Sequence, residues 1–344
     1  MRAVVFREGS AWAVEDVSTP EPGPGEVRLR LVLTGVCGTD MHLLHGGFIA
    51  KFPLIPGHEM VGQVEAVGDD VTELSVGQQV VVDNTIHCGG CRHCRRGQPL
   101  FCSSFTSLGC NAPGGFAENV VVQAAKCYPM DTVPAEIAVF SEPLSCAMHG
   151  VDVLALAPAS DVLVFGAGPT GLLLAQLLRL AGAARVTVAA PSEHKLALAK
   201  AYGIESTVRI DRDDPGSAIT ELHRLATGGF DAIVEATGAV SILDQCPSLT
   251  TEGGTILVYG LTNESDLMAL RPYEVFSREL TVRGSFAQVH CFDRATAVLG
   301  GGRVHTDGMI TDRVTLDTFG AALDGLGRSA TIKTVVAPNQ KELV

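Results

Sequence analysis

The sequence of 344 residues predicts an α/β protein with a β-rich domain and a second domain built on a doubly wound parallel sheet. Short apolar runs separated by glycine and proline turns dominate up to about residue 147. A glycine-rich turn then follows the apolar run 162–165, and strands alternate with helices. We expect residues 1–147 and 287–344 to form one domain and residues 148–286 the other.

The β-rich domain has expected strands at 27–33, 60–67 and 79–82, and no long amphipathic helix before Glu142. The run 333–336 near the C-terminus is a further strand of this domain. In the second domain we expect strands at 162–165, 185–189, 232–235, 255–259 and 281–282, with helices ending near residue 182 and covering 193–202.

Composition and charge argue against several classes of function and location. A formal net charge of -13 opposes binding to nucleic acid or to an anionic membrane. The N-terminus has no apolar core of a signal peptide, and the apolar stretch 171–180 is too short and too polar to span a bilayer. Ten cysteines without a secretion signal indicate the cytoplasm, where clustered thiols bind metals more often than they form disulfides.

The stretch from Cys37 to Glu59 combines the ligand types that suit Zn²⁺. Cys37 supplies a thiolate, His58 an imidazole and Glu59 a carboxylate. Three protein ligands with one open position are typical of a catalytic zinc site. Thr39 and His42 lie close to Cys37 in the sequence and can carry a proton away from a hydroxyl group at the metal.

A second cysteine cluster predicts a structural metal. Its spacing is Cys-x2-Cys-x2-Cys-x7-Cys, and four thiolates close the coordination shell of a tetrahedral zinc. An iron–sulfur cluster is the main alternative. We favour zinc because nothing else in the sequence indicates electron transfer. The ligands are Cys88, Cys91, Cys94 and Cys102.

The glycine-rich turn after the run 162–165 opens a helix, which is the context of a dinucleotide-binding turn. Glycines let the backbone approach a pyrophosphate, and the helix N-terminus favours its charge. An ordinary tight turn between strand and helix is the alternative. The expected contacts are Gly166, Gly168, Pro169, Thr170 and Gly171.

The second strand of this domain lacks the acidic residue that grips the ribose 2′-hydroxyl of NAD. Ala190 stands at its end, and Ser192, His194 and Lys195 follow as donors for a 2′-phosphate. We therefore favour NADP over NAD. Glu193 opposes this prediction, and a hydrophobic ribose edge that accepts NAD is the alternative.

Together these motifs resemble the zinc-containing medium-chain alcohol dehydrogenase family over essentially the full length, in its sorbitol (polyol) and threonine dehydrogenase branch. The matching segments are 37–42, 57–59, the four-cysteine loop, 141–145 and 166–171. The resemblance implies a GroES-like catalytic domain and a Rossmann domain. It also implies two zinc ions per chain, one catalytic and one structural.

The resemblance adds Glu142 to Cys37, His58 and Glu59 as a ligand of the catalytic zinc, either directly or through water. Without the match of residues 143–145 beside it, Glu142 would be better explained as a helix N-terminal carboxylate favoured by the dipole. We interpret the nearby Cys146 and His149 as packing residues. The resemblance further implies that the nicotinamide half of the cofactor is lined by Thr237, Gly260, Leu261, Ser285 and Phe286.

The implied activity is hydride transfer between a secondary alcohol, a polyol or sugar alcohol, and NAD(P), in a cytoplasmic homo-oligomer (tetramer or dimer). Sorbitol itself is in doubt because Ala287 stands where relatives of that type often carry an arginine; Gln288, His290 and Arg294 are nearby polar residues without a role. The alternatives are an L-threonine or small-diol dehydrogenase and a non-catalytic NADP-binding protein. A zinc-free enone reductase is disfavoured, because that group lacks the motif 57–59 and the four cysteines.

Overall fold

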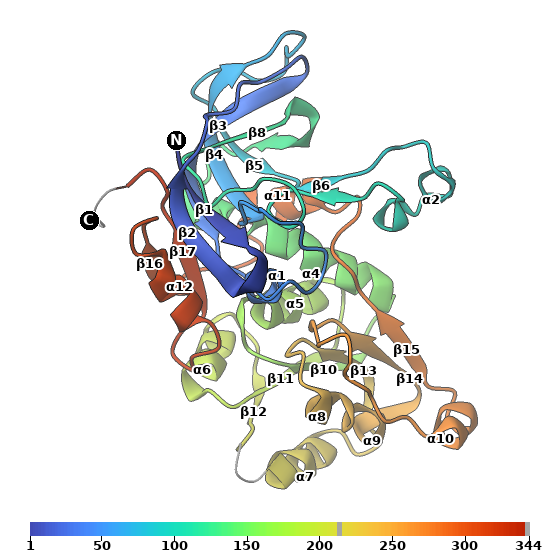
Figure 1. Cartoon of the computed structure of the whole chain (residues 1–344). Helices are drawn as coiled ribbons and strands as arrows, with labels where there is room; N and C mark the ends of the chain where they lie inside the picture. The colour runs from blue at the N-terminus through green and yellow to red at the C-terminus, as the bar shows by residue number, and fades with distance from the viewer. Residues whose placement is uncertain (212–214, 341–344) are drawn as a thin grey trace. The chain divides into compact units, whose positions relative to one another are not determined.

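The computed structural model describes residues 1–211 and 215–340, and its chain divides into two compact units. The first unit comprises Met1–Ser145 and the C-terminal segment from Val289, and the second comprises Cys146–Gln288. The boundaries expected from the sequence, 147/148 and 286/287, each lie two residues from these. Figure 1 labels the elements of both units.

The first unit is built on a seven-stranded sheet with the order β16-β17-β3-β4-β5-β9, in which β8 also pairs with β3. All pairs are antiparallel except β16 with β17. The strands of this unit are β1 (Arg2–Arg7), β2 (Ala11–Asp16), β3 (Glu26–Gly35), β4 (Glu59–Val67), β5 (Gln79–Val82), β6 (Thr85–Ile86), β7 (Thr106–Ser107), β8 (Asn119–Gln123), β9 (Cys127–Pro129), β16 (Ile310–Val314) and β17 (Lys333–Val336). Its helices are α1 (Gly38–Leu44), α2 (Arg92–Arg95), α3 (Ala135–Ala138), the start of α4 (Ser141–Leu154), α11 (Phe292–Gly300) and α12 (Phe319–Gly325).

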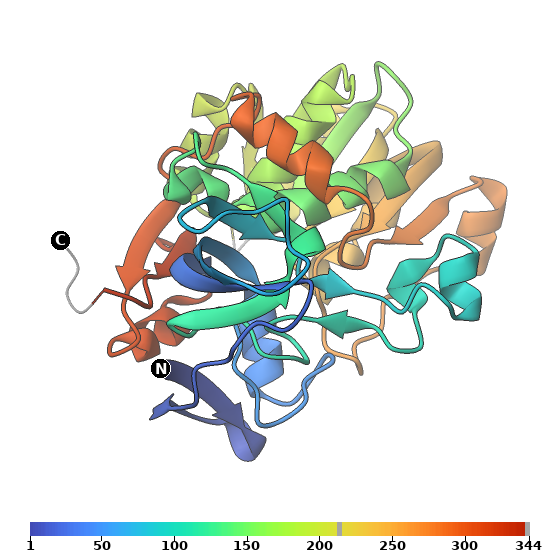
Figure 2. The ribbon, with the colours of Figure 1, turned by 90° about the horizontal axis from the view of Figure 1, so that it is seen from above.

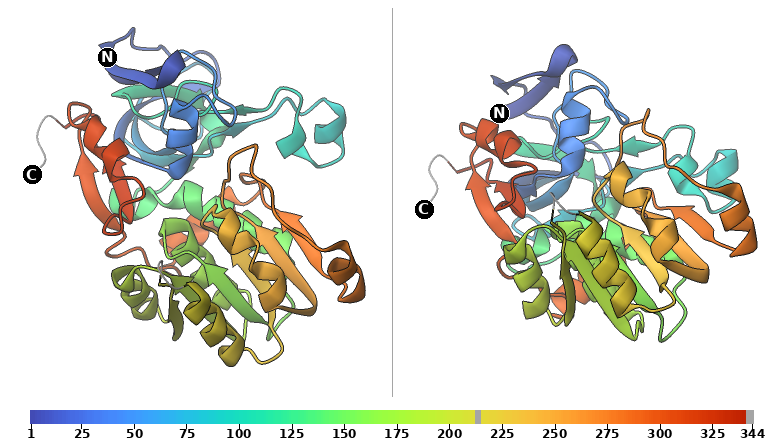
Figure 3. Two further views of the ribbon diagram at one scale, coloured as in Figure 1. Left: turned by 60° about the horizontal axis from the view of Figure 1, so that its bottom comes forward. Right: turned by 90° about the horizontal axis from the view of Figure 1, so that it is seen from below.

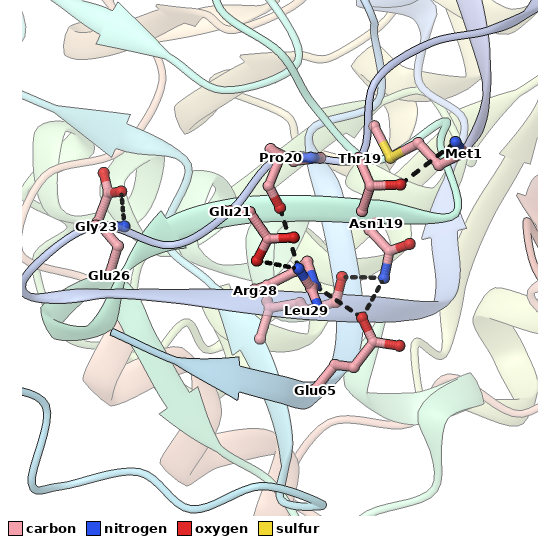
Figure 4. A network of polar contacts seen from close by, with 10 residues as sticks. All are labelled: Met1, Thr19, Pro20, Glu21, Gly23, Glu26, Arg28, Leu29, Glu65 and Asn119. Atoms are coloured by element: carbon pink, nitrogen blue, oxygen red, sulfur yellow. Dashed lines mark hydrogen bonds and ion pairs between the residues drawn. The ribbon is translucent and has the colours of Figure 1, made fainter. Parts of the chain in front are cut away.

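A polar network ties neighbouring strands of this sheet together (Figure 4). Arg28 on β3 donates to Glu21 at 2.6 Å and to Glu65 on β4 at 2.8 Å. Asn119 on β8 donates to the same Glu65 oxygen at 2.9 Å and to the carbonyl of Leu29. One carboxylate therefore connects three strands, which fixes the register of the part of the sheet remote from α1.

The paired strands β6 and β7, together with α2, form a lobe of the first unit. Both Figure 1 and Figure 2 show it projecting from the seven-stranded sheet. The lobe includes the four-cysteine loop and a short 3-10 turn, Pro99–Phe101. Its apolar core is small, since Phe101 is exposed. A covalent or metal cross-link is the usual way to stabilise so small a structure.

The second unit is an all-parallel six-stranded sheet with the order β12-β11-β10-β13-β14-β15. Its central strands β10, β11 and β13 are mostly apolar and buried, because both faces of the sheet are covered there. Its elements are β10 (Asp161–Phe165), α5 (Pro169–Leu180), β11 (Arg185–Ala190), α6 (Glu193–Ala201), β12 (Ser206–Arg209), α7 (Pro215–Leu225), β13 (Phe230–Glu235), α8 (Val240–Leu243), α9 (Cys246–Leu249), β14 (Thr250–Val258), α10 (Pro272–Ser277) and β15 (Thr281–Gly284).

The two faces of this sheet have separate helical layers. Helices α7 to α9 pack on one face, which Figure 3 shows, and contribute Leu222, Cys246 and Leu249 to a buried cluster with Leu163 and Phe165. Helices α5 and α6 lie against β10, β11 and β12. Strand order reverses between β10 and β13, and such a switch point is where doubly wound sheets bind ligands.

The predicted fold class, a β-rich domain with a doubly wound parallel sheet, is confirmed. The strand expected at 255–259 begins earlier, because β14 starts at Thr250 and continues through a register shift against β13. One stretch, Ala135–Leu154, meets the length and composition of a membrane span. This is weak evidence for a span, since 61% of its window is buried within the chain, as in core helices.

Candidate active site

The candidate metal site begins at the N-terminus of α1, where Cys37 is the N-cap residue. The backbone N–H of Cys37 donates to Oδ2 of Asp40 at 2.9 Å, which forms a capping box with the N3 residue of the helix. This bond fixes the thiol at the end of β3. The Sγ of Cys37 lies 3.5 Å from Oγ1 of Thr39.

His58 and Glu59 reach the same place from the start of β4. Gly57 precedes them with φ +93°, and a Cβ there would lie 2.7 Å from the ring of Phe116, so only glycine fits. Ligand atoms of Cys37, His58 and Glu59 all lie within 4.8 Å of one another. A thiolate, an imidazole and a carboxylate therefore converge as a zinc ion requires.

Asp40 connects the two segments, and the sequence analysis did not identify it. Its side chain is fully buried, and its Oδ1 lies 3.6 Å from Nδ1 of His58. Neither of these two atoms has a hydrogen-bond partner among the described residues. A carboxylate beside the second nitrogen of a metal-binding histidine orients the ring.

Two opposing effects, burial and neighbouring charge, act on the pKa of His58. Burial lowers the pKa of His58, but the charges of Cys110 and Asp40 outweigh it and raise the pKa well above its usual value. A positive charge at this position is therefore favoured, and a metal ion supplies one without the proton.

Lys333 on β17 lies behind the cluster and is 3% exposed. Its Nζ is 2.6 Å from Oε1 and 2.5 Å from Oε2 of Glu59, and it donates to the carbonyl of Val36 at 3.1 Å. Burial lowers the pKa of Lys333, but the charges of Glu59, Cys37 and Glu142 raise it above its usual value. Two buried carboxylates, Glu59 and Glu142, thus act on the one ammonium group of Lys333, so the charges here would stabilise a further positive ion.

The other predicted residues of this site take separate positions. Glu142 is buried in the first turn of α4 and contributes to the field at Lys333, but it lies outside the group of three ligands. Thr39 and His42 stand three residues apart on α1 and therefore share a face of that helix. His42 is half-buried, as a group that exchanges protons with solvent requires.

The four predicted cysteines of the lobe converge on one point. Their sulfur atoms lie within 4.8 Å of one another, and all four are free thiols. Backbone N–H groups of Cys88, Cys91 and Ser104 donate to cluster sulfurs at 3.3 to 3.4 Å. Hydrogen bonds from the backbone of Cys94 and Ser103 lower the pKa of Cys91, whereas burial and the neighbouring cysteines raise the pKa of Cys94, so in the metal-free cluster the thiolate is favoured at Cys91. The donor set fits a closed tetrahedral zinc site.

The glycine turn of the second unit has the backbone of a pyrophosphate site. Gly166 adopts φ +109°, and a Cβ on Gly171 would lie 2.1 Å from the carbonyl of Gly166. Both glycines are thus required by the turn and its packing. A Cβ on Gly168 would meet no atom of the described chain within 4 Å. Packing does not require glycine at this position, whereas close approach of a phosphate group does.

Glu235 at the end of β13 holds the turn that contains Thr237. The carboxylate is fully buried and accepts hydrogen bonds from the N–H groups of Thr237 and Gly238 at 2.7 to 3.1 Å and from the Thr237 hydroxyl. Gly260 lies against the same turn, since a Cβ there would lie 2.1 Å from the nitrogen of Gly238. Thr237, Gly260 and the partly exposed Leu261 are therefore adjacent at the carboxyl edge of the sheet.

The remaining predicted cofactor contacts lie at the same edge. Ala190 ends β11 and is buried, and Ser192, His194 and Lys195 surround the start of α6. Ser285 follows β15, and its hydroxyl is buried without a partner among the described residues. Phe286 follows it in the chain. An unpartnered hydroxyl at the carboxyl edge is a group that a bound ligand can satisfy.

Comparison with known proteins decides the family. The family model "Alcohol dehydrogenase GroES-like domain" matches residues 23–132, and "Zinc-binding dehydrogenase" matches residues 169–299. D-arabinitol dehydrogenase 1 of Uromyces fabae is 41% identical over 340 residues, which cover 98% of this chain and 97% of that protein. The chain belongs to the zinc-containing medium-chain dehydrogenase family. The resemblance inferred from the sequence motifs is thus confirmed.

Two other relatives refine its place in this family. L-threonine 3-dehydrogenase of Xanthomonas campestris pv. campestris (strain B100) is 35% identical over 271 residues, covering 76% of this chain and 77% of that one. A crystal structure from Sinorhizobium meliloti 1021, described as a zinc-binding dehydrogenase bound to NADP, has a TM-score of 0.92 and 32% identity, covering 98% and 99% of the two chains. The dehydrogenase therefore belongs to the polyol and threonine branch and is an oxidoreductase that acts on alcohols with NAD(P).

The sequence analysis missed three residues of this dehydrogenase that the structure brings into its sites: Asp40, Lys333 and Glu235. Asp40 had a local signal, since an acidic residue at N3 of a helix is typical of a capping box. Glu235 ends an apolar strand, which is also a detectable position. Lys333 had no such local signal, because its partner Glu59 lies 274 positions earlier in the chain.

Proposed function

We propose that this dehydrogenase oxidises a secondary hydroxyl of a polyol or sugar alcohol, with NADP as the favoured cofactor. The observation that carries the proposal is the convergence of the half-buried Cys37 with the buried His58 and Glu59, a ligand set that leaves a coordination position for substrate. The similarity to D-arabinitol dehydrogenase 1 along almost the whole chain supports a polyol. The absence of a carboxylate at Ala190 and the similarity to an NADP-bound structure support NADP.

In this proposal each chain holds two zinc ions. Cys37, His58 and Glu59 hold the catalytic ion, with Glu142 as a fourth ligand directly or through water; the four lobe cysteines hold the structural one. When bound, the catalytic zinc lowers the pKa of an alcohol hydroxyl and the nicotinamide accepts hydride. Thr39 accepts the hydroxyl proton at Oγ1 while its own proton moves on toward His42, which releases a proton to solvent. Lys333 holds Glu59 in place, and Asp40 orients His58.

The cofactor contacts follow the edge of the parallel sheet. The turn from Gly166 to Gly171 receives the pyrophosphate at the N-terminus of α5. Thr237, Gly260, Leu261, Ser285 and Phe286 contact the nicotinamide half. Ala190, Ser192, His194 and Lys195 surround the adenosine ribose.

We further infer a cytoplasmic homo-oligomer, a dimer or a tetramer. Strand β15 is an edge strand, and Tyr273 and Phe276 on α10 before it are 78% and 80% exposed. An exposed edge beside large apolar side chains favours pairing with a second copy. Ten free thiols, four of them in one cluster, are stable in a reducing compartment.

The test is a turnover assay on purified, zinc-loaded protein. Reduced nicotinamide is followed with NAD and NADP separately against D-arabinitol, other pentitols and hexitols, small diols, simple alcohols and L-threonine. We expect the highest kcat/KM with a polyol and NADP. A higher kcat/KM with L-threonine would replace the polyol assignment by the second candidate, which the 35% identical threonine dehydrogenase supports.

A further inference from the structure

Arg209 is the C-terminal residue of β12, beside the strand end that decides between NAD and NADP. β11 and β12 are parallel, and Arg209 is the register partner of Ala190. Ala190 occupies the position where NAD-binding sheets carry an acidic residue. The backbone of Arg209 therefore lies one strand away from that of Ala190, a spacing of about 5 Å, beside the predicted ribose site.

The alternation of side chains places Arg209 on the same face as Ala190. Ala189 and Val208, the preceding register pair, are both part of the apolar cluster beneath α7 and α9. Successive residues of a strand point to opposite faces, so Ala190 and Arg209 point away from that cluster. Helices α5 and α6 cover this second face.

Glu193, the first residue of α6, holds the guanidinium there. Nη1 of Arg209 lies 2.8 Å from Oε1 of Glu193, and the two side chains are 61% and 75% exposed. An ion pair this exposed is weak. It is also open to exchange, because both partners can exchange their contact for water or for another ion.

We propose that Arg209 binds the 2′-phosphate of NADP and that Glu193 competes for the same guanidinium. This inference rests on the proposed function, since it concerns the cofactor of that enzyme. A 2′-phosphate carries about two negative charges near neutral pH, against one on Glu193, so it displaces the carboxylate from Arg209. Glu193 thus reduces the preference for NADP without abolishing it, and Arg209 is a specificity-determining residue.

The proposal gives Glu193 a defined role. The sequence alone showed an acidic residue that opposes a 2′-phosphate. The structure pairs it with Arg209, so in the free protein the guanidinium offsets part of the charge of this carboxylate. Lys195 lies in the same first turn of α6 and adds a second positive charge at this strand end.

The test measures dissociation constants by calorimetry on the zinc-loaded protein, with NADPH, NADH, 2′,5′-ADP and 5′-AMP as the probes. For Arg209→Gln we expect about tenfold weaker binding of NADPH and of 2′,5′-ADP, with NADH and 5′-AMP changed less than about twofold. Arg209→Lys retains most of the charge and is expected to lose about threefold. The loss should shrink at high salt, because the contact is exposed.

Glu193→Gln is expected to tighten NADPH about threefold and to leave NADH unchanged. In the Arg209→Gln background the same change should have little effect, since the two side chains act through one contact. A gain that persists in that background would overturn the competition, because Glu193 would then act on the phosphate directly.

Arg224→Gln is the matched control. Arg224 is an exposed arginine paired with Glu221 at 2.7 Å, in the last turn of α7. Its helix runs back toward the amino edge of the sheet, so this variant changes the net charge equally but should bind all four probes as the wild type does.

Equal loss of NADPH and NADH in Arg209→Gln, or no loss of either, would overturn the proposal. A wild-type protein that binds NADH more tightly than NADPH would contradict the proposed cofactor preference. It would leave the role of Arg209 to be decided by the change in the NADPH to NADH ratio alone. The two failures are therefore distinguishable.

Discussion

The two cysteine-containing sites of the first unit differ in what surrounds their thiols. The half-buried Cys37 converges with the buried His58 and Glu59, which contact the buried Asp40 and Lys333. The lobe cluster has four equivalent sulfurs on one loop, and only Cys102 among them is buried. One site brings three kinds of ligand from two separate elements, α1 and β4, whereas the other wraps one kind of ligand within a single loop of fifteen residues.

If each site holds a zinc ion, as proposed above, this difference gives the same metal two roles. Four thiolates from a short loop satisfy a zinc ion completely, and the loop gains structure from it. Three mixed ligands on preformed elements leave a position for substrate, and the surrounding charges set the electrostatics. We therefore expect the four-cysteine site to serve stability and the site of Cys37, His58 and Glu59 to serve chemistry.

The largest expected effect is on turnover. Cys37→Ser removes a ligand of the open site, and we expect kcat/KM to fall about a thousandfold or more, since the metal stabilises charge in the transition state. Thermal unfolding should change little, because β3 and α1 keep their backbone contacts. The control is Cys127→Ser, a partly buried thiol outside both clusters. Retained turnover in Cys37→Ser would remove this residue from the metal site.

The reverse pattern is expected for Cys91→Ser in the lobe. Loss of a structural metal belongs to the most destabilising class of substitutions, above about 4 kcal/mol, which corresponds to a fall in Tm on the order of 10 °C. The surviving folded protein should keep its kcat within about threefold. Scanning calorimetry and active-site titration measure the two quantities. An unchanged Tm in protein that has lost this metal would contradict the structural role.

Lys333→Met tests whether the charge of Lys333 stabilises the open site. It leaves Glu59 buried without a cation, which costs about 3–5 kcal/mol. A bound zinc ion supplies the missing positive charge, so we expect the metal-free protein to be destabilised more than the zinc-loaded protein. Melting both forms of Lys333→Met and of the conservative Lys333→Arg checks this. Equal destabilisation of both forms would mean that Lys333 has no electrostatic relation to the metal.

The smallest expected effect is on the pH dependence of metal retention. The raised pKa of His58 means that its imidazolium stabilises the metal-free fold at low pH and that this contribution is lost as the pH rises through the folded pKa. Zinc competes with this proton, so a chelator should remove activity faster at pH 6 than at pH 8. The rate of activity loss at fixed chelator concentration measures it. A rate that falls on acidification would contradict competition at His58.

Local sequence patterns were enough to predict the fold class, and they selected the cysteines that converge in each group; the metal that each group binds stays a prediction. The spacing within the four-cysteine loop, the turn from Gly166 to Gly171 and the continuous apolar strand β10 are short-range signals whose physical causes act within a few residues. The pairing of Lys333 with Glu59 could not be predicted, because it depends on β17 joining β3 in the sheet. Arg209 was missed for the same reason, since its relation to Ala190 is a strand register.

The most direct test of the two roles is the visible spectrum of the cobalt-substituted protein during titration with imidazole, a small ligand for an open metal position. Cys37→Ser and Cys91→Ser assign the bands of each site. We predict that imidazole shifts only the bands that Cys37→Ser removes, while those that Cys91→Ser removes stay constant. A shift of the bands of the four-cysteine site would contradict a closed metal site there. Unchanged bands of the Cys37 site would contradict an open position at that metal.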